Sequence, residues 1–440
     1  MKRNLYPLLL DWKNSKSRKP LILRGARQVG KTFLLKKFGE LEYPTFHYFN
    51  FEREPGLNSF FDSDLDPQKI IHNLALKLGK VINVQNDLVI FDEIQNCPKA
   101  LTALKYFCED LPELNLACAG SHMGLIFMDG SFPVGKAHFL DLYPMNFEEF
   151  LNYRNQNAWE VFQKCKTSLA LSDIEHEILW NHLKEYYVVG GMPEAVKVFI
   201  STKGGFLQSR IIQKDLVEQY INDFHKYSGK LNALQLATVF KDIPKQLSTT
   251  QDGNAQKYKF KGVLKGKIGY RELSGPIEWL TSSSLAMKIN ISNKAEVPLL
   301  SYCKANMFKL FMFDIGILGA MLDLDINSIL DQNYGTTKGY FAENFVAQEL
   351  LANGEKTLIG WNQNKAEIEF LIQSQNNITP IEVKSGTNLK AQSLTSFLKR
   401  YSPKKAIKVS AKNFHIDLNQ ITQNIPLYSV GFAIKKIIES

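Results

Sequence analysis

A glycine-rich segment near the amino terminus carries the clearest chemistry in the sequence. Residues 25–32 read Gly-Ala-Arg-Gln-Val-Gly-Lys-Thr, which matches the G-x-x-x-x-G-K-[ST] pattern of a phosphate-binding loop. In this pattern backbone N–H groups surround phosphate oxygens, Lys31 reaches the β- and γ-phosphates, and Thr32 offers its hydroxyl to Mg²⁺. The segment therefore predicts a site for a nucleotide with Mg²⁺. The loop residues expected around the phosphates are Gly25, Ala26, Arg27, Gln28, Val29 and Gly30.

The sequence on both sides of this segment fits the same prediction. Residues 20–24 read Pro-Leu-Ile-Leu-Arg and indicate a short buried strand, and residues 32–38 begin an amphipathic helix. A helix that starts at the loop adds a partial positive charge where the phosphates would lie. A chance glycine-rich turn is the alternative, but chance would not require a strand before the loop and a helix after it.

Two acids follow a second apolar run. Leu88–Phe91 is apolar throughout, which is typical of a strand buried on both faces of a parallel sheet, and Asp92 and Glu93 come directly after it. Open α/β sheets bind ligands at the carboxyl ends of such strands. Asp92 would hold Mg²⁺, and Glu93 would act as the general base on an attacking water. The alternative is an ordinary strand followed by an aspartate that caps a helix.

A third group of charged residues lies in the last part of the chain. A predicted helix over 339–352 precedes a segment over 366–372 that alternates acidic and apolar residues like a half-buried strand. After a turn, residues 380–386 form a second strand. Two acids can bind Mg²⁺ while a lysine activates water, which is the layout of phosphodiester cleavage; the alternative is an edge hairpin with solvated charges. The candidate nuclease residues are Glu343, Glu369, Glu382 and Lys384.

Length and composition limit the class of protein. The chain has 440 residues, enough for two or three domains, and no apolar run reaches the roughly 18 residues of a membrane-spanning helix. Its five scattered cysteines favour a reducing cytoplasm over a disulfide scaffold. The net charge of +9 permits DNA binding, and a solvated lysine-rich surface explains it equally well. We expect a cytoplasmic protein with no membrane partner.

The pattern of apolar residues predicts an α/β protein with several parts. Five strands alternate with helices in the first part. Later, helices are followed by an expected hairpin between 286–291 and 298–304, which indicates a winged helix, with lysines over 257–267 that could contact a phosphate backbone or lie in a solvated loop. The predicted domains are an ATPase domain over 1–155, a helical lid or linker over 156–230, a winged-helix-like region over 231–304, and a nuclease-like domain over 305–440. The predicted strands of the first part cover 21–24, 45–50, 88–91, 115–119 and 137–141, and the predicted helices that follow cover 174–187, 207–227, 231–244 and 270–281.

Taken together, these motifs resemble one family. The chain is similar over nearly its whole length to prokaryotic AAA+-type P-loop ATPases whose C-terminal domain of unknown function resembles the PD-(D/E)xK, restriction-endonuclease-like fold. The resemblance implies a parallel-sheet ATPase core, a winged-helix-like middle and a C-terminal α/β nuclease-like domain. The segments that carry it are 25–32, 91–95, 120–121, 142–150, 190–195, 309–310, 314–316, 343–344, 366–370 and 381–386.

The resemblance also implies roles for single residues. Ser121 would sense the γ-phosphate, with His122 as second choice; a helix N-cap is the alternative for Ser121. The family usually has Gly-Arg where this chain has Gly135-Lys136, and no arginine occurs from 54 through 153. Lys136 could replace that arginine, Arg154 could act instead, or hydrolysis could be slow, because lysine is a point charge and arginine a planar, bidentate donor. Glu369 stands where the family usually has Asp, which questions nuclease activity.

Three functional hypotheses follow. The first is a Mg²⁺-dependent ATPase whose cycle rearranges the domains, possibly for DNA processing or cleavage. The second is a nucleotide-regulated switch that binds DNA or a protein partner through an inactive nuclease-like domain. The third is a nucleotide-binding scaffold without turnover. The loop pattern does not distinguish ATP from GTP, and the sequence leaves the oligomeric state open.

Overall fold

The computed structural model describes residues 1–121, 135–248, 257–266, 269–363, 366–387, 392–416 and 421–439, with only the backbone for 226–231. The chain divides into two compact units. The first unit comprises residues 1–143 with 282–284, and the second comprises 144–281 with 285–440.

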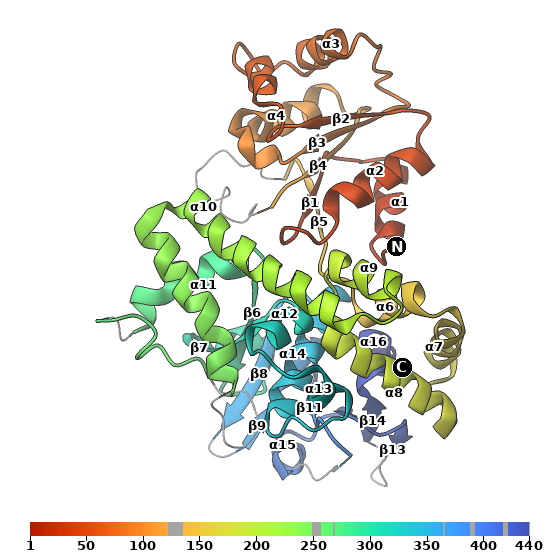
Figure 1. The fold of residues 1–440 in the computed structure, drawn as a ribbon, viewed down its shortest axis with the longest axis vertical. Helices are drawn as coiled ribbons and strands as arrows, with labels where there is room; N and C mark the ends of the chain where they lie inside the picture. Colours follow the sequence, from red (N-terminus) through yellow and green to blue (C-terminus); the bar gives the residue numbers. More distant parts are fainter. Residues whose placement is uncertain are drawn as a thin grey trace. The chain divides into compact units, whose positions relative to one another are not determined.

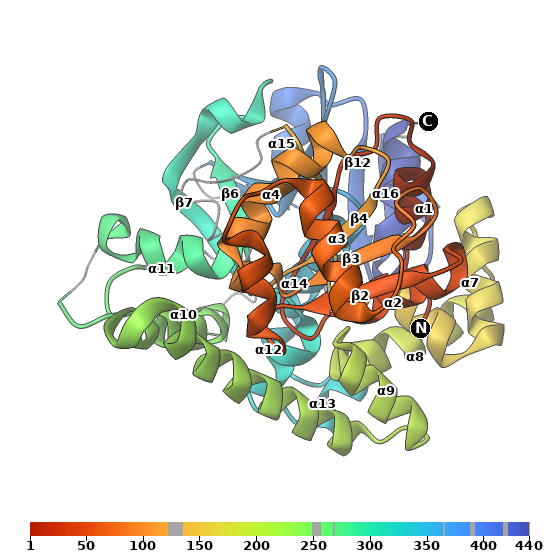
Figure 2. The same ribbon diagram turned by 90° about the horizontal axis from the view of Figure 1, so that it is seen from above.

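The first unit is built on a parallel sheet of five strands in the order β2-β3-β4-β1-β5 (Figure 1). Helix α2 packs on strands β2, β3 and β4, and α3 and α4 contribute to the apolar core on the opposite face (Figure 2). The strands are β1 (Leu21–Arg24), β2 (Phe46–Asn50), β3 (Leu88–Asp92), β4 (Asn115–Ala119) and β5 (His138–Asp141). The helices are α1 (Tyr6–Asn14), α2 (Lys31–Glu42), η1 (Pro55–Phe61), α3 (Pro67–Leu78), η2 (Ile94–Asn96) and α4 (Pro98–Asp110).

Apolar runs place these strands in the middle of the unit. Every residue of β3 and β4 is buried, as their continuous apolar character predicts for strands covered on both faces. The ring of Phe91 lies edge-on to the rings of Phe49, Phe51 and Phe107 at centroid distances of 5.5–6.2 Å. The parallel sheet and its five predicted strands are confirmed, and the parallel arrangement brings the carboxyl ends of β1, β3 and β4 to one edge.

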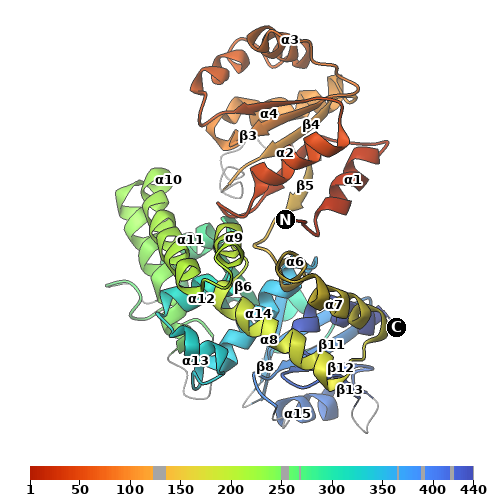
Figure 3. The same cartoon turned by 45° about the vertical axis from the view of Figure 1, so that its right-hand side comes forward.

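The second unit combines helices with two sheets. A mixed sheet has the order β7-β6-β8-β9, and a second sheet has the order β10-β11-β12-β14-β13. The long helix α10 packs beside α9 and α12 (Figure 3). The helices are α6 (Phe147–Arg154), α7 (Gln156–Ser168), α8 (Asp173–Val189), α9 (Pro193–Ser201), α10 (Phe206–Ser248), α11 (Tyr270–Ser282), η3 (Leu299–Tyr302), α12 (Ile315–Met321), α13 (Ile326–Leu330), α14 (Thr337–Ala352), α15 (Gln392–Tyr401), η4 (Leu427–Ser429) and α16 (Val430–Glu439). The strands are β6 (Ala286–Ser292), β7 (Cys303–Met312), β8 (Leu358–Gln363), β9 (Ala366–Ile368), β10 (Phe370–Ser374), β11 (Asn377–Val383), β12 (Ala406–Ser410), β13 (His415–Ile416) and β14 (Thr422–Pro426).

Several elements differ from the sequence prediction. Helix α10 is continuous where two helices and a boundary at 230/231 were expected, because Gly229 weakens a helix without ending it. The boundary expected at 304/305 falls inside β7, and β7 rather than 298–304 supplies the antiparallel partner of β6. Helix α11, in contrast, agrees with the helix predicted over 270–281 and runs through Pro276.

A glycine-packed junction holds distant parts of the second unit together. Gly191 N donates to Asp314 Oδ2 at 2.6 Å, and Met145 N donates to the Gly191 carbonyl at 2.7 Å. A Cβ on Gly191 would lie 2.1 Å from the Met145 carbonyl oxygen, so only glycine fits there. Phe147 N also donates to the buried Glu349 carboxylate at 2.8 Å, 202 residues away in the chain.

Candidate functional site

The phosphate-binding loop lies between β1 and α2, as predicted. Gly25 has a φ of +148° and Gly30 a φ of +97°, and α2 begins directly after Gly30. A Cβ on Gly25 would lie 2.1 Å from the Leu142 carbonyl oxygen. The loop therefore needs glycine at both ends, one for close backbone approach and one for left-handed backbone at the helix start.

Lys31 is buried at the end of this loop and, in the part of the chain that the structure describes, has no acidic hydrogen-bond partner. Its Nζ donates to the carbonyls of Gly25 at 2.9 Å and Ala26 at 2.8 Å. Burial lowers the pKa of the Lys31 ammonium to about 8, and the charges of Glu93 and Asp92 oppose that shift only in part. A buried cation that is held by carbonyl groups alone is suited to receive an anion, as a nucleotide phosphate would be.

Asp92 and Thr32 meet as the two motifs predicted. Thr32 Oγ1 donates to Asp92 Oδ2 at 2.8 Å. The same oxygen accepts from the Tyr48 hydroxyl at 2.6 Å and more distantly from Asn50 Nδ2 at 3.4 Å, since Asn50 on β2 is the register partner of Asp92 on β3. A hydroxyl and a carboxylate side by side are oxygen ligands of the kind that Mg²⁺ takes, so these two residues fit the ion.

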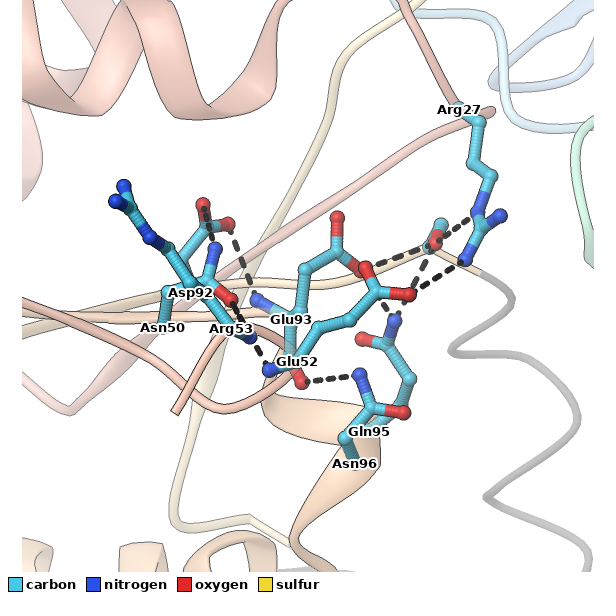
Figure 4. Close-up of polar contacts among 9 residues, drawn as sticks. Arg27, Asn50, Glu52, Arg53, Asp92, Glu93, Gln95 and Asn96 are labelled. Atoms are coloured by element: carbon cyan, nitrogen blue, oxygen red, sulfur yellow. Dashed lines mark hydrogen bonds and ion pairs between the residues drawn. The ribbon is translucent and has the colours of Figure 1, made fainter. Parts of the chain in front are cut away.

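Glu93 lies next to Asp92 in a polar network (Figure 4). Its φ of +51° turns the backbone sharply as β3 ends. Glu93 Oε2 accepts from Gln95 Nε2 and, at 3.4 Å, from Ser121 Oγ. Ser121 is fully buried and also accepts from Arg27 Nε at 3.4 Å, so the sensor candidate joins the loop to the candidate base.

Two other residues considered for the site lie elsewhere. Lys136 forms an ion pair with Glu109 at 2.9 Å and precedes the first residue of β5, which puts it at the amino-terminal edge of the sheet. The loop leaves the opposite edge, so the structure does not bring Lys136 to Lys31 within one chain. Arg154 pairs with Glu185 at 3.1 Å. His122 lies outside the described residues.

The candidate nuclease residues do come together in the second unit. Glu343 on α14, Glu369 and Glu382 are each 1–2% exposed. Val383 N donates to Glu369 Oε2 at 3.0 Å, and Lys384 pairs with Glu382 Oε1 at 2.7 Å. The predicted hairpin is confirmed as β10 and β11, but 366–372 is not one strand: Glu369 separates β9 and β10, which belong to different sheets.

A lysine that had no predicted role occupies this cluster. Lys309 Nζ on β7 pairs with Glu343 at 3.0 Å and with Glu367 at 2.5 Å. Burial alone would lower the pKa of Lys309, but the charges of Glu343, Glu367 and Glu369 outweigh it and raise that pKa. Burial, reinforced by Glu382 and Glu343, raises the pKa of the Glu369 carboxyl.

Lysines share this arrangement with the acids. Two ammonium groups, from Lys309 and Lys384, lie within ion-pair distance of three of the acids. Within the described ranges, no three His, Cys, Asp or Glu side chains are grouped as a metal site would require. The cluster is therefore an ion-pair centre in which two lysines offset part of the charge of four acids.

Sequence reasoning missed several of these partners. Lys309 stands alone in the apolar run 307–313, and a single charge in such a strand is a signal for a buried partner. Tyr48 and Asn50 could have been found from the parallel pairing of β2 with β3.

The lysine-rich segment over 257–267 was predicted either to contact a phosphate backbone or to lie in a solvated loop. The lysines at 257, 259, 261 and 265 are exposed, and Lys267 lies outside the described residues.

Three family models match three separate stretches of the chain. Residues 17–151 match a family model described as an AAA domain. Residues 181–328 and 338–430 match two models described as domains of unknown function, DUF8612 and DUF4143. With the parallel sheet and the loop geometry, the first match identifies the amino-terminal unit as a P-loop domain of the AAA type.

Three proteins that are similar to most of this chain have low sequence identity to it. An uncharacterized protein of Methanocaldococcus jannaschii is 24% identical over 365 residues, which cover 81% of this chain and 72% of that protein. The Walker-type ATPase PABY2304 of Pyrococcus abyssi has a TM-score of 0.45 at 18% identity over 73% of this chain and 95% of that one. The Aeropyrum pernix Orc1 protein, solved in complex with DNA, has a TM-score of 0.28 at 12% identity over 74% and 92%.

Among the residues that the structure describes, no helix is both long and apolar enough to cross a membrane.

Proposed function

We propose that the first unit binds ATP with Mg²⁺ and hydrolyses it. The contact of Thr32 with Asp92 beside the carbonyl-held Lys31 is the observation that carries this proposal. Thr32 and Asp92 would hold Mg²⁺, which neutralises phosphate charge when it is bound. The AAA domain match supports ATP as the nucleotide.

Each residue of the site has a task in this reaction. The loop N–H groups and Lys31 bind the phosphates, which aligns the terminal one for attack. Glu93 accepts the proton of the attacking water and orients that water. Gln95 and Ser121 hold the Glu93 carboxylate in place, since both donate to Glu93 Oε2.

Phosphate release from ATP with Mg²⁺ tests the proposal. Glu93→Gln should lower the rate by about 100- to 10,000-fold, the range for loss of a positioned acid–base group, and Lys31→Ala should also lower it because the phosphates lose their buried counter-charge. Lys37→Ala on the same helix, whose side chain pairs only weakly with Glu40 at 3.3 Å, is the matched control and should keep the wild-type rate. Equal rates in wild type and Glu93→Gln would contradict hydrolysis and leave a binding scaffold.

For the second unit, the ion pairs of Lys309 favour a switch over a nuclease. We propose that ATP turnover rearranges the domains, and that the winged-helix-like and nuclease-like parts bind a partner, DNA or protein, without cleaving it, in the cytoplasm. The ion pairs with Lys309 and Lys384 support this alternative, since among the described residues no three His, Cys, Asp or Glu side chains are grouped as a metal site would require. A DNA-nicking assay with Mg²⁺ tests it: nicking by wild type that disappears in Glu382→Ala would contradict the switch and restore the nuclease hypothesis.

A further inference from the structure

An open cleft lies beside helix α15 in the second unit. Its volume is about 600 Å³, and α15 lines it together with strands β8 and β9. The α15 residues that line it recur every three to four positions, so they share one face of the helix. The side chains that define its chemistry are Trp361 and Gln363 from β8 and Ser393, Ser396, Lys399 and Arg400 from α15.

The cleft and the ion-pair centre lie on opposite faces of β9. Ala366 lines the cleft, whereas the next residue, Glu367, pairs with Lys309 at 2.5 Å. Successive side chains of a strand point to opposite faces, which separates the two sites. The cleft is therefore a second polar site in this unit, with its own set of charges.

The described residues that line the cleft include two cations and no acid. Lys399 and Arg400 are exposed in the last turn of α15, and among the described residues neither pairs with a carboxylate. Arg400 Cζ instead lies 5.5 Å from the centroid of the Tyr401 ring. The Ser393 hydroxyl accepts from Glu367 N at 3.2 Å and keeps its own proton for another acceptor. A cleft lined by charges of one sign attracts a ligand of the opposite sign.

Trp361 and Gln363 add a donor and an acceptor that the protein leaves unused. Trp361 is 2% exposed, and among the described residues its Nε1–H has no acceptor. In the same part of the chain, Gln363 Oε1 is buried without a donor. Native proteins satisfy most buried polar groups, because an unsatisfied one lowers stability. A ligand with both an acceptor oxygen and a hydroxyl group would satisfy both.

We propose that this cleft binds a small sugar phosphate, with its phosphate monoester held by Lys399, Arg400 and the Trp361 N–H. A monoester carries about 1.5 to 2 negative charges at pH 7 and three acceptor oxygens, so it matches two cations and a third donor. A carboxylate or a phosphodiester carries one charge and would leave one cation without a partner. Gln363 would accept from a sugar hydroxyl. The cleft is large enough, because pockets for small ligands typically enclose about 300–1,000 Å³.

Nuclear magnetic resonance of the full chain with isotope-labelled tryptophan tests the proposal. ADP and Mg²⁺ in excess keep the phosphate-binding loop occupied, and the loss of one signal in Trp361→Phe assigns the Trp361 indole N–H. We expect ribose 5-phosphate to shift that signal. The Trp12 signal should stay in place, because Trp12 Nε1 already donates to the Lys19 carbonyl at 2.8 Å. Ribose should give no shift, and gluconate, with one carboxylate, should bind at least about tenfold more weakly.

Substitutions of the two cations measure their contribution. Lys399→Gln and Arg400→Gln should each raise the Kd for ribose 5-phosphate about 10- to 100-fold, the range for loss of a hydrogen bond to a charged group. Lys404→Gln is the matched control, because Lys404 is exposed and does not line the cleft. Cations in the last turn also stabilise a helix, so thermal unfolding checks that each variant is folded.

Three results would overturn the proposal. Ribose 5-phosphate at millimolar concentration could leave the Trp361 signal unchanged, gluconate could bind as tightly, or Lys399→Gln and Arg400→Gln could bind as tightly as Lys404→Gln. The cleft belongs to the second unit, so a failed ATPase assay leaves this proposal standing and a failed titration leaves the proposed ATPase standing.

Discussion

The chain contains two centres built from the same residue types, and they treat charge in opposite ways. In the phosphate-binding site, the acids Asp92 and Glu93 accept from neutral hydroxyl and amide groups, while Lys31 donates to carbonyls. In the second unit, the lysines pair directly with the acids, as Lys309 does with Glu343 at 3.0 Å.

The pKa values of the lysines in the two centres shift in opposite directions. Burial lowers the pKa of Lys31 to about 8, whereas the neighbouring carboxylates raise the pKa of Lys309 and of Lys384 against the effect of burial. A lysine that lacks a carboxylate partner has charge available for a ligand. A lysine that is paired on both sides stabilises the fold instead, so residue type and burial alone do not identify a binding site.

Replacing the paired lysine should have the largest effect. Lys309→Met leaves buried carboxylates without their counter-charge, which should lower the free energy of unfolding by about 3–5 kcal/mol. Urea unfolding measures it, with Lys214→Met as control. Lys214 pairs with Asp323 at 2.6 Å on the surface, with side chains 52% and 81% exposed, so water screens the pair and its loss should change the free energy of unfolding far less. A loss in Lys309→Met as small as in the control would mean that the ion pairs of Lys309 do not stabilise the second unit.

Binding of a nucleotide with Mg²⁺ should stabilise the phosphate-binding site and leave the ion-pair centre unchanged. At about 100 times its Kd, a non-hydrolysable ATP analogue with Mg²⁺ should stabilise the first unit by about 2.7 kcal/mol, seen as slower hydrogen exchange in β3. Asp92→Asn should lose most of this protection, and Glu382→Gln should keep it. Slower hydrogen exchange in β10 and β11 with Mg²⁺ alone would show that the ion-pair cluster binds a metal. The two centres would then not differ in how they treat charge.

The pH dependence of nucleotide binding should follow the protonation of the Lys31 side chain. Lys31 loses its proton near pH 8 in the nucleotide-free protein, and bound phosphates favour its charged form and raise its pKa. Above pH 8 binding must therefore take up a proton, so Kd should rise by up to about tenfold, or about 1.4 kcal/mol, per pH unit. Titrations from pH 7 to 9.5 measure this rise, and Lys31→Arg should remove it because arginine stays charged. The same rise in Lys31→Arg would assign the titration to another group.

Removing a neutral donor should have the smallest effect. Tyr48→Phe deletes the hydroxyl that donates to Asp92 at 2.6 Å, which should cost the first unit about 1–2 kcal/mol in urea unfolding. Tyr106→Phe on α4 is the control, since among the described residues its hydroxyl has no hydrogen bond that the substitution removes. A loss as large as that expected of Lys309→Met would erase the difference between neutral and charged partners.

The sequence predicted local features and missed those that depend on distant partners. The loop, β1 and β3 follow from short patterns of glycine and apolar residues, and the contact of Thr32 with Asp92 follows from placing both motifs at one sheet edge. The pairing of Lys309 with Glu343 joins residues 34 apart on a strand and a helix, and no local period encodes it. Likewise, the alternation of acidic and apolar residues over 366–372 would be the same in a strand of one sheet as in a segment that changes sheets at Glu369.

Helix boundaries were missed for a related reason. Two helices were predicted over 207–227 and 231–244, but α10 is continuous through both and through Gly229 between them. Helix α10 packs against α9, α12 and α8, and such packing outweighs the roughly 1 kcal/mol that a helical glycine costs. Propensity describes an isolated segment, and these helices are not isolated.

The glycine-packed junction has a consequence for how the protein is made. Phe147 at the start of α6 needs a carboxylate that lies 202 residues later, and Gly191 needs Asp314. At about 5–20 residues per second, a ribosome takes roughly 10–40 s to add 200 residues. For that interval the segment 147–201 has been made but still lacks its contacts with Asp314 and Glu349. The first unit can finish folding by then, so nascent chains should depend on chaperones at the stage when the ATPase domain is already complete.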